Sequence, residues 1–182
     1  MWRNALLAVG ILVLCSAPVA QAQQSWLDAP RQDWNSAGMP VPRPPQEVVI
    51  DTFCESAMRP PETPEDDVLI AAGWRLSVPY QGAWGVKVIE GIAAQDGMCR
   101  PIRYQQFVFV EGAFAGTIAP APMNSRAGDP GKVSWFSRDA VIVDFARFKA
   151  GDSFCCPSGT PIAMPMKVDR TPSGPVLRLE KS

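Results

Sequence analysis

The chain has 182 residues, of which 47% are hydrophobic, with 17 basic residues, 18 acidic residues and no histidine. The absence of histidine excludes Ser-His-Asp and Cys-His nucleophile pairs and histidine-ligated zinc. The basic residues are scattered singly, so the basic patch of a nucleic-acid-binding protein is missing and no nucleic acid is expected as a partner. The hydrophobic content is too high for a disordered chain, and the length suits one domain.

Residues 1–22 have the pattern of an export signal peptide. Arg3 supplies the positive start, residues 5–14 are apolar, and Ala20-Gln21-Ala22 offers small residues for cleavage. The apolar run is shorter than the roughly 20 residues that cross a bilayer. We therefore expect an exported protein, periplasmic or extracellular, that begins near Gln23 and has no membrane span.

Cys15 offers an alternative, because a cysteine near the end of a signal peptide is the acceptor of lipid in lipoproteins. Leu14 stands before it, where such a signal normally has Gly, Ala or Ser. We expect Cys15 to be removed with the signal peptide. Lipidation is the other interpretation, in which a lipid holds the protein on a membrane.

Residues 23–47 form an arm rich in tryptophan and proline, ahead of a single domain at 48–182. Trp26 and Trp34 are its large side chains, and four prolines between residues 40 and 45 favour an extended path. The arm is either a ligand for a groove on a partner or a segment whose tryptophans dock on the protein's own domain. We favour docking, since exposed tryptophan is unusual on a monomer.

One helix is predicted, over residues 64–72. Thr63 is the expected N-cap, Pro64 takes the first helical position, and Gly73 ends the helix. Three acidic residues follow Pro64, and their interaction with the positive end of the helix dipole explains them better than a metal site does.

After Gly73 the sequence predicts short strands and turns. Apolar residues alternate over 74–80, and further strands are expected at 86–92, in a hairpin over 106–118 that bends at Glu111-Gly112, and at 132–136, 140–148, 162–168 and 176–180. Pro165 cannot donate to a ladder, so its strand is expected at a sheet edge or with that backbone position facing solvent. The fold class is α+β and mainly antiparallel β: a curved or two-layered sheet with one short helix, braced by disulfides.

The four cysteines after the signal peptide predict two disulfides in an oxidising compartment. Neighbouring side chains on an extended backbone point to opposite faces, so Cys155 and Cys156 are expected to reach Cys54 and Cys99, one each, as a structural scaffold. All three connectivities stay open, and a direct Cys155–Cys156 bond would indicate redox chemistry. Paired C-x-x-C spacing is absent, so no metal and no cofactor are predicted.

No catalytic motif is found, so we expect a non-enzymatic binding or structural module. The stretch "YQGAWG" makes Tyr80 and Trp84 candidates for contact with a ligand or partner, as Trp26 and Trp34 are in the arm. The expected partner is an envelope protein or a cell-wall component. Two alternatives remain: a hydrolase of wall polymers that uses carboxylates or a bound cation, and an enzyme inhibitor that presents the loop over residues 120–132.

Several stretches together resemble the LppP/LprE-type lipoprotein family. They are "DGMCRPIRYQQFVFVEGAFAGTIAPAPMNSR", "DFARFKAGDSFCCPSG" and "GPVL", with "AGWRL" after the predicted helix. The resemblance implies an exported cell-envelope protein with a single cysteine-bridged domain. It implies no established activity and supplies no catalytic residues.

Overall fold

The computed structural model describes residues 25–45, 50, 52–124, 130–149, 151–153 and 155–180. The predicted signal peptide and Cys15 lie outside the described residues, as do the side chains of residues 125–132 in the loop proposed for an inhibitor. No helix within the described ranges has the length and apolar character needed to cross a membrane.

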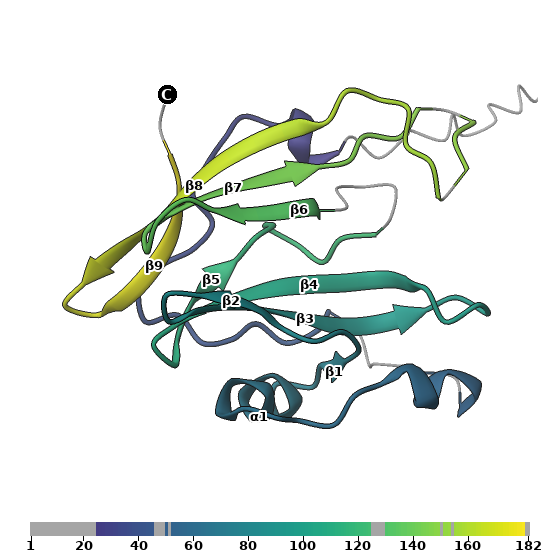
Figure 1. The fold of residues 1–182 in the computed structure, drawn as a ribbon, viewed down its shortest axis with the longest axis horizontal. Coiled ribbons are helices and arrows are strands. Elements are labelled where there is room, and N and C mark those ends of the chain that lie inside the picture. The colour runs from purple at the N-terminus through teal and green to yellow at the C-terminus, as the bar shows by residue number, and fades with distance from the viewer. Residues whose placement is uncertain are drawn as a thin grey trace, which may run out of the picture.

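The described residues form two antiparallel sheets that face each other (Figure 1). In the first sheet, β3 (Val86–Gln95) pairs with β4 (Pro101–Val110), which pairs with β5 (Ala113–Thr117). Two short strands, β1 (Arg75–Leu76) and β2 (Gln81–Ala83), extend the other side of β3. The second sheet runs in the order β6 (Pro130–Trp135), β7 (Ala140–Phe145), β8 (Ile162–Thr171) and β9 (Gly174–Leu179). The predicted fold class is confirmed.

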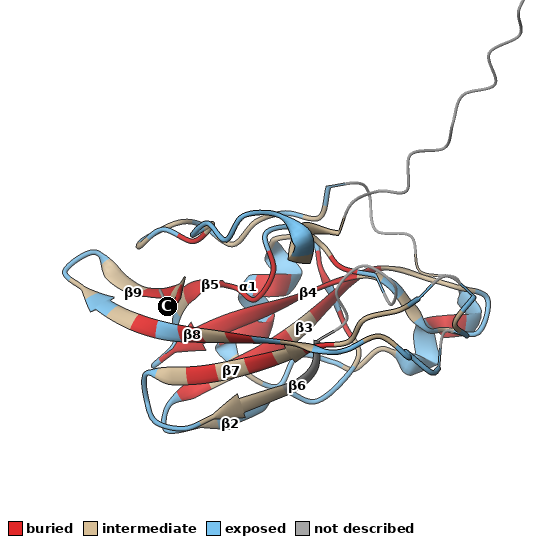
Figure 2. Cartoon of the chain, turned by 90° about the horizontal axis from the view of Figure 1, so that it is seen from above, coloured by how far each residue is buried: buried red, intermediate tan, exposed pale blue. Residues whose placement is uncertain are grey.

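The main core lies between the two sheets. Buried and less buried residues alternate along β7 (Figure 2). Val141, Val143 and Phe145 are the buried ones, and they share one core with buried residues of the first sheet. The opposite face of the first sheet is covered by helix α1 (Pro64–Ala71), where Leu69 and Trp74 pack against Phe107. The molecule therefore has three layers: a helix, a five-stranded sheet and a four-stranded sheet.

Helix α1 begins as predicted and ends one residue earlier. Thr63 accepts a hydrogen bond from the Asp66 backbone, and the Asp66 carboxylate accepts one from the Thr63 backbone in return. The Asp66 side chain is fully buried and forms a bidentate ion pair with the Arg59 guanidinium, with N···O distances of 2.7 and 2.8 Å. The carboxylate therefore joins the start of the helix to the preceding segment as well as capping it.

Two strand predictions need correction. The alternating stretch 74–80 is not one strand, because only Arg75 and Leu76 pair with β3 before Pro79 interrupts the ladder. Of the two alternatives expected for the Pro165 strand, the position at a sheet edge is wrong, since β8 lies between β7 and β9. Pro165 is accommodated because it lies opposite Glu180, just past the end of β9, where its carbonyl accepts a hydrogen bond from the Glu180 backbone.

The arm runs from the second sheet to the first, past β9 and β5, as the purple segment in Figure 1 shows. Asn35 is buried there and donates to the backbone carbonyls of Thr117 on β5 and Leu177 on β9, at 2.9 and 3.0 Å. It also accepts from the Thr117 N–H at 2.9 Å. Gly116 has a φ of +136°, and a Cβ at this position would collide with the Asn35 side chain. One side chain of the arm thus joins the edges of both sheets.

Candidate functional site

Two hairpin turns lie side by side at one end of the sandwich. Trp84-Gly85 connects β2 to β3 with φ values of +50° and +78°, and Glu111-Gly112 connects β4 to β5 with φ values of +52° and +85°. Positive φ at both central residues is the type I′ conformation, which favours Asn, Asp or Gly at the first position. The Glu111 N–H donates to the Gly85 carbonyl at 2.7 Å and so holds the turns together.

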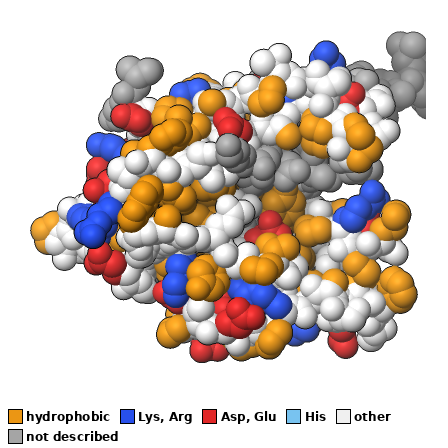
Figure 3. Space-filling view, viewed as in Figure 1, with side chains coloured by type: hydrophobic (Ala, Val, Ile, Leu, Met, Phe, Trp, Pro, Cys, Tyr) orange, Lys and Arg blue, Asp and Glu red, His pale blue; other side chains and the backbone are white. Residues whose placement is uncertain are grey.

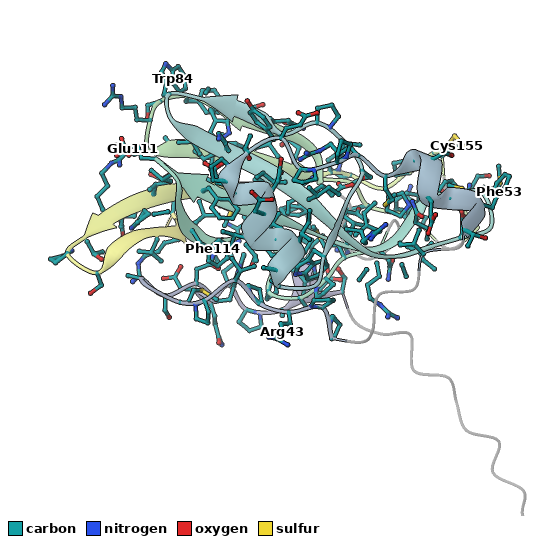
Figure 4. All side chains as sticks on the ribbon, turned by 90° about the horizontal axis from the view of Figure 1, so that it is seen from below. Arg43, Phe53, Trp84, Glu111, Phe114 and Cys155 are labelled. Carbon is teal, nitrogen blue, oxygen red and sulfur yellow. A yellow bond between two sulfur atoms is a disulfide. The ribbon has the colours of Figure 1, made fainter. Side chains whose placement is uncertain are left out.

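The aromatic side chains near these turns are open to solvent. Trp84 is 53% exposed and Tyr80 is 39% exposed, with the Lys87 ammonium 5.3 Å from the centre of the Tyr80 ring. Both aromatic residues that the sequence singles out for contact are therefore accessible from solvent. Figure 4 shows Trp84 and Glu111 at the same end of the molecule.

A third turn extends this end onto the second sheet. Phe136, directly after β6, is 65% exposed. Arg170 of β8 pairs with Asp139 of that turn at 3.3 Å and with Glu111 at 3.6 Å. We call Tyr80, Trp84, Glu111, Phe136 and Arg170 the turn surface. Figure 3 shows hydrophobic side chains gathered in patches on the face where β2 and β6 lie.

Charges around the turn surface are held in ion pairs. Both Glu65 carboxylate oxygens accept from Lys87, at 2.9 and 2.8 Å. Burial alone would raise the pKa of Glu65, but hydrogen bonds from Lys87, from its own backbone and from the Thr63 side chain bring it below its ordinary value. The Lys87 side chain is thereby held against the Tyr80 ring.

The two tryptophans of the arm lie elsewhere. The Trp26 ring packs edge-on against Phe145 and Trp34, with ring centres 5.1 and 5.6 Å away, and both tryptophans contact the core between the sheets. They also line a hollow of about 290 Å³ with Pro30 and Leu179. The structure therefore brings Tyr80 and Trp84 to one surface and sets Trp26 and Trp34 against the protein's own core.

The disulfide pairing differs from the expected one. Cys54 is bonded to Cys99, and Cys155 is bonded to Cys156. The expected cross-links fail because Cys155 lies in a turn, closed by a hydrogen bond from the Cys156 N–H to the Ser153 carbonyl, and not on an extended strand. The argument from alternating side chains does not apply to a turn, and the alternative direct bond is the one formed.

The Cys54–Cys99 bond joins the short helix η2 (Thr52–Ala57) to the turn between β3 and β4, with Cα atoms 5.3 Å apart. The two bonded residues are 45 positions apart in the chain. Cross-linking a loop of that length is worth about 4 kcal/mol through the unfolded state. This disulfide is the structural one.

The enzymatic alternative requires converging acids, one of them with a raised pKa. Among the described carboxyl groups, every shifted pKa is lowered: those of Glu65, Asp66, Asp96 and Asp152. The described ranges also contain no group of three His, Cys, Asp or Glu residues able to hold a metal ion. These carboxylates are partners of N–H groups and cations.

The inhibitor alternative requires a loop that stands away from the domain. The first part of that loop does not, since Met123 is buried and its backbone exchanges two hydrogen bonds with Tyr104 of β4, at 3.0 and 2.7 Å. The side chains of residues 125–132 lie outside the described part.

Sequence reasoning identified Trp84 but missed Glu111, Phe136 and Arg170 as its surroundings. Glu111-Gly112 was recognisable as a turn, whereas its position beside Trp84-Gly85 follows only from the pairing of β3 with β4. Arg170 carries no sequence signal of its own.

The fold and its cysteines define a class: a small disulfide-braced β-sandwich with one covering helix. Residues 83–163 match the family model described as LppP/LprE lipoprotein, which confirms the predicted resemblance over that stretch. The match includes Trp84, Glu111 and Phe136 of the turn surface but not Tyr80 or Arg170. It includes every disulfide-bonded cysteine except Cys54. No curated protein and no solved structure matches the chain. The description names a lipoprotein family and specifies no activity.

Proposed function

We propose that this protein is a non-enzymatic binding module of the cell envelope that contacts its partner through the turn surface. The observation that carries the proposal is the state of Trp84, which is half exposed and occupies a left-handed position in a type I′ turn. A bulky residue at such a position is a backbone outlier, and outliers that persist gather at functional sites.

The placement of Trp84 is unfavourable for folding. A left-handed conformation costs a bulky residue about 1–2 kcal/mol, a cost that Asn largely avoids. Half of the indole also stays in water, where it contributes nothing to the core. A partner that covers the ring buries this apolar area. The entropy lost on binding is small, because the tight turn already restricts the backbone and a tryptophan has only two side-chain torsions.

The partner class follows from the chemistry of the turn surface. Trp84, Tyr80 and Phe136 offer apolar ring faces, and Glu111 and Arg170 offer a carboxylate and a guanidinium beside them. A saccharide ring presents C–H groups on its faces and hydroxyls at its rim, which match both kinds of group. A cell-wall glycan is therefore the ligand that we propose, in the periplasm or outside the cell.

The test compares Trp84→Asn with Phe53→Asn. Phe53 is exposed but lies at the opposite end of the molecule (Figure 4), so its replacement is a matched control. We expect the mature wild-type protein to co-sediment with purified wall glycan, Trp84→Asn to lose at least about tenfold in affinity, and Phe53→Asn to bind as the wild type does.

The free energy of unfolding of Trp84→Asn is expected to lie within about 1 kcal/mol of the wild-type value, because relief of the left-handed strain offsets the lost ring contacts. Equal binding by Trp84→Asn, or equal loss in both variants, would contradict the role of the turn surface. Failure of the wild type to bind any wall glycan would contradict the choice of ligand.

A further inference from the structure

The loop between β7 and β8 carries a disulfide between neighbouring residues, Cys155 and Cys156, and both residues are exposed. Figure 4 shows Cys155 at the outer margin of the molecule, at the end opposite Trp84. Attack on a disulfide requires access to its sulfur atoms. Cys54, in the other disulfide, is by contrast fully buried.

This bond does not serve to stabilise the fold. A disulfide acts mainly by restricting the unfolded chain, and its effect grows with the length of the loop that it closes. Adjacent residues close no loop, so their bond removes almost none of the freedom of the unfolded chain. The Cys54–Cys99 bond is explained by its contribution to stability. The Cys155–Cys156 bond is not, so it calls for another role.

The loop is held by contacts that do not involve sulfur. The Asp152 carboxylate accepts from the backbone N–H groups of Lys149 and Ser158, at 2.6 and 2.9 Å, and from the Ser158 hydroxyl at 2.9 Å. The Gly159 N–H donates to the Arg147 carbonyl at 2.9 Å and closes the base of the loop. Opening the disulfide therefore leaves these bonds in place and confines the change to the apex.

The Asp152 carboxylate stays ionised at the pH of the envelope. The Ser158 and Lys149 backbone N–H groups are the main cause that lowers its pKa below the ordinary value. As a charged acceptor it makes stronger hydrogen bonds than a neutral one, so the frame of the loop does not depend on the state of the cysteines.

We propose that Cys155–Cys156 is a thiol–disulfide exchange site that accepts two electrons from a dithiol reductant. A thiolate of the dithiol attacks one of the two sulfurs, which forms a mixed disulfide and breaks the Cys155–Cys156 bond. The released cysteine thiolate takes up a proton. The second thiolate of the reductant then attacks the mixed disulfide, releases the other cysteine, which is also protonated, and leaves the reductant as a disulfide.

A dithiol is required because of the position of the leaving group. After the first attack, the freed cysteine is next in sequence to the one in the mixed disulfide and remains in the same loop. Its effective concentration is high, so it reverses the step unless the reductant resolves the intermediate with a thiol of its own. A monothiol has no second thiol and depends on a second collision.

The experiment uses the mature, non-reduced protein with both disulfides, so that Cys54–Cys99 serves as an internal control. The protein is titrated with dithiothreitol, free thiols are capped with N-ethylmaleimide, and each cysteine is followed by peptide mass spectrometry. We expect Cys155 and Cys156 to be capped at a reductant concentration at least about tenfold below that for Cys54 and Cys99. The near-ultraviolet circular dichroism of the folded protein should persist at that stage.

In a parallel titration with 2-mercaptoethanol at equal thiol concentration, the ratio of reduced to oxidised Cys155–Cys156 should be about tenfold lower than with dithiothreitol. Three results would overturn the proposal: reduction of Cys54–Cys99 before or together with the adjacent pair, equal reduction by the monothiol and the dithiol, or peptides in which Cys155 or Cys156 is bonded to Cys54 or Cys99. None of these outcomes depends on glycan binding, so this test is independent of the function proposed for the turn surface.

Discussion

Replacement of Asn35 by alanine tests whether the arm is part of the fold. Asn35 makes hydrogen bonds to the edge strand of each sheet, across 82 and 142 positions of sequence. These bonds lie in a buried site, because Asn35 is only 3% exposed. The substitution removes them without changing the backbone of either strand.

The expected loss of stability follows from the backbone groups that lose their hydrogen bonds to Asn35. The Thr117 N–H and the Leu177 carbonyl lose their bonds to Asn35, whereas the Thr117 carbonyl still accepts from the Trp34 indole at 2.9 Å. A buried backbone group without a partner costs about 1–3 kcal/mol. Two such groups predict a loss of about 2–6 kcal/mol in the free energy of unfolding, a large share of a domain's total stability.

The assay is urea unfolding followed by tryptophan fluorescence and far-ultraviolet circular dichroism. Ser36→Ala is the matched control, since Ser36 is the next residue of the arm and is exposed. It should change the free energy of unfolding by less than about 0.5 kcal/mol. A loss below about 1 kcal/mol for Asn35→Ala, or equal losses for the two variants, would refute the inference that this side chain joins the sheets.

Two further predictions concern stability. Burial tends to raise the pKa of Asp66, but bonds from Arg59 and from the Glu62 and Thr63 backbones lower it overall, so its contribution is fully present above the unfolded pKa of about 3.9 and is lost as the pH falls through the folded pKa. Asp66→Asn should therefore cost about 3 kcal/mol near pH 7, because it leaves the Arg59 side chain, which is only 9% exposed, without its carboxylate partner, and much less near pH 2. An equal cost at both pH values would contradict this. The double variant Cys54→Ser and Cys99→Ser should lose about 4 kcal/mol in chemical denaturation, and the variant Cys155→Ser with Cys156→Ser less than about 1 kcal/mol; similar losses would show that loop length does not govern these bonds.

Features that depend on neighbouring residues were predictable from the sequence. Thr63, Pro64 and Gly73 predict helix α1 to within one residue, because capping and termination act over three or four positions. The Glu111-Gly112 turn was predictable for the same reason, since a glycine at positive φ selects a two-residue hairpin. The alternating apolar residues of β7 and β8 likewise predict strands with one buried face.

Features that depend on distant segments were decided only by the tertiary structure. The order of the strands places β8 between β7 and β9, and the fold brings η2 beside the turn between β3 and β4, where Cys54 is bonded to Cys99. Local sequence carries no information on which strand lies beside which, because pairing depends on how the whole chain buries its apolar faces. The sequence alone thus determined the helix, most of the strands, the class of fold and the family resemblance. Only the tertiary structure determined the Cys54–Cys99 pairing, the role of Asn35 and the exposure of Trp84.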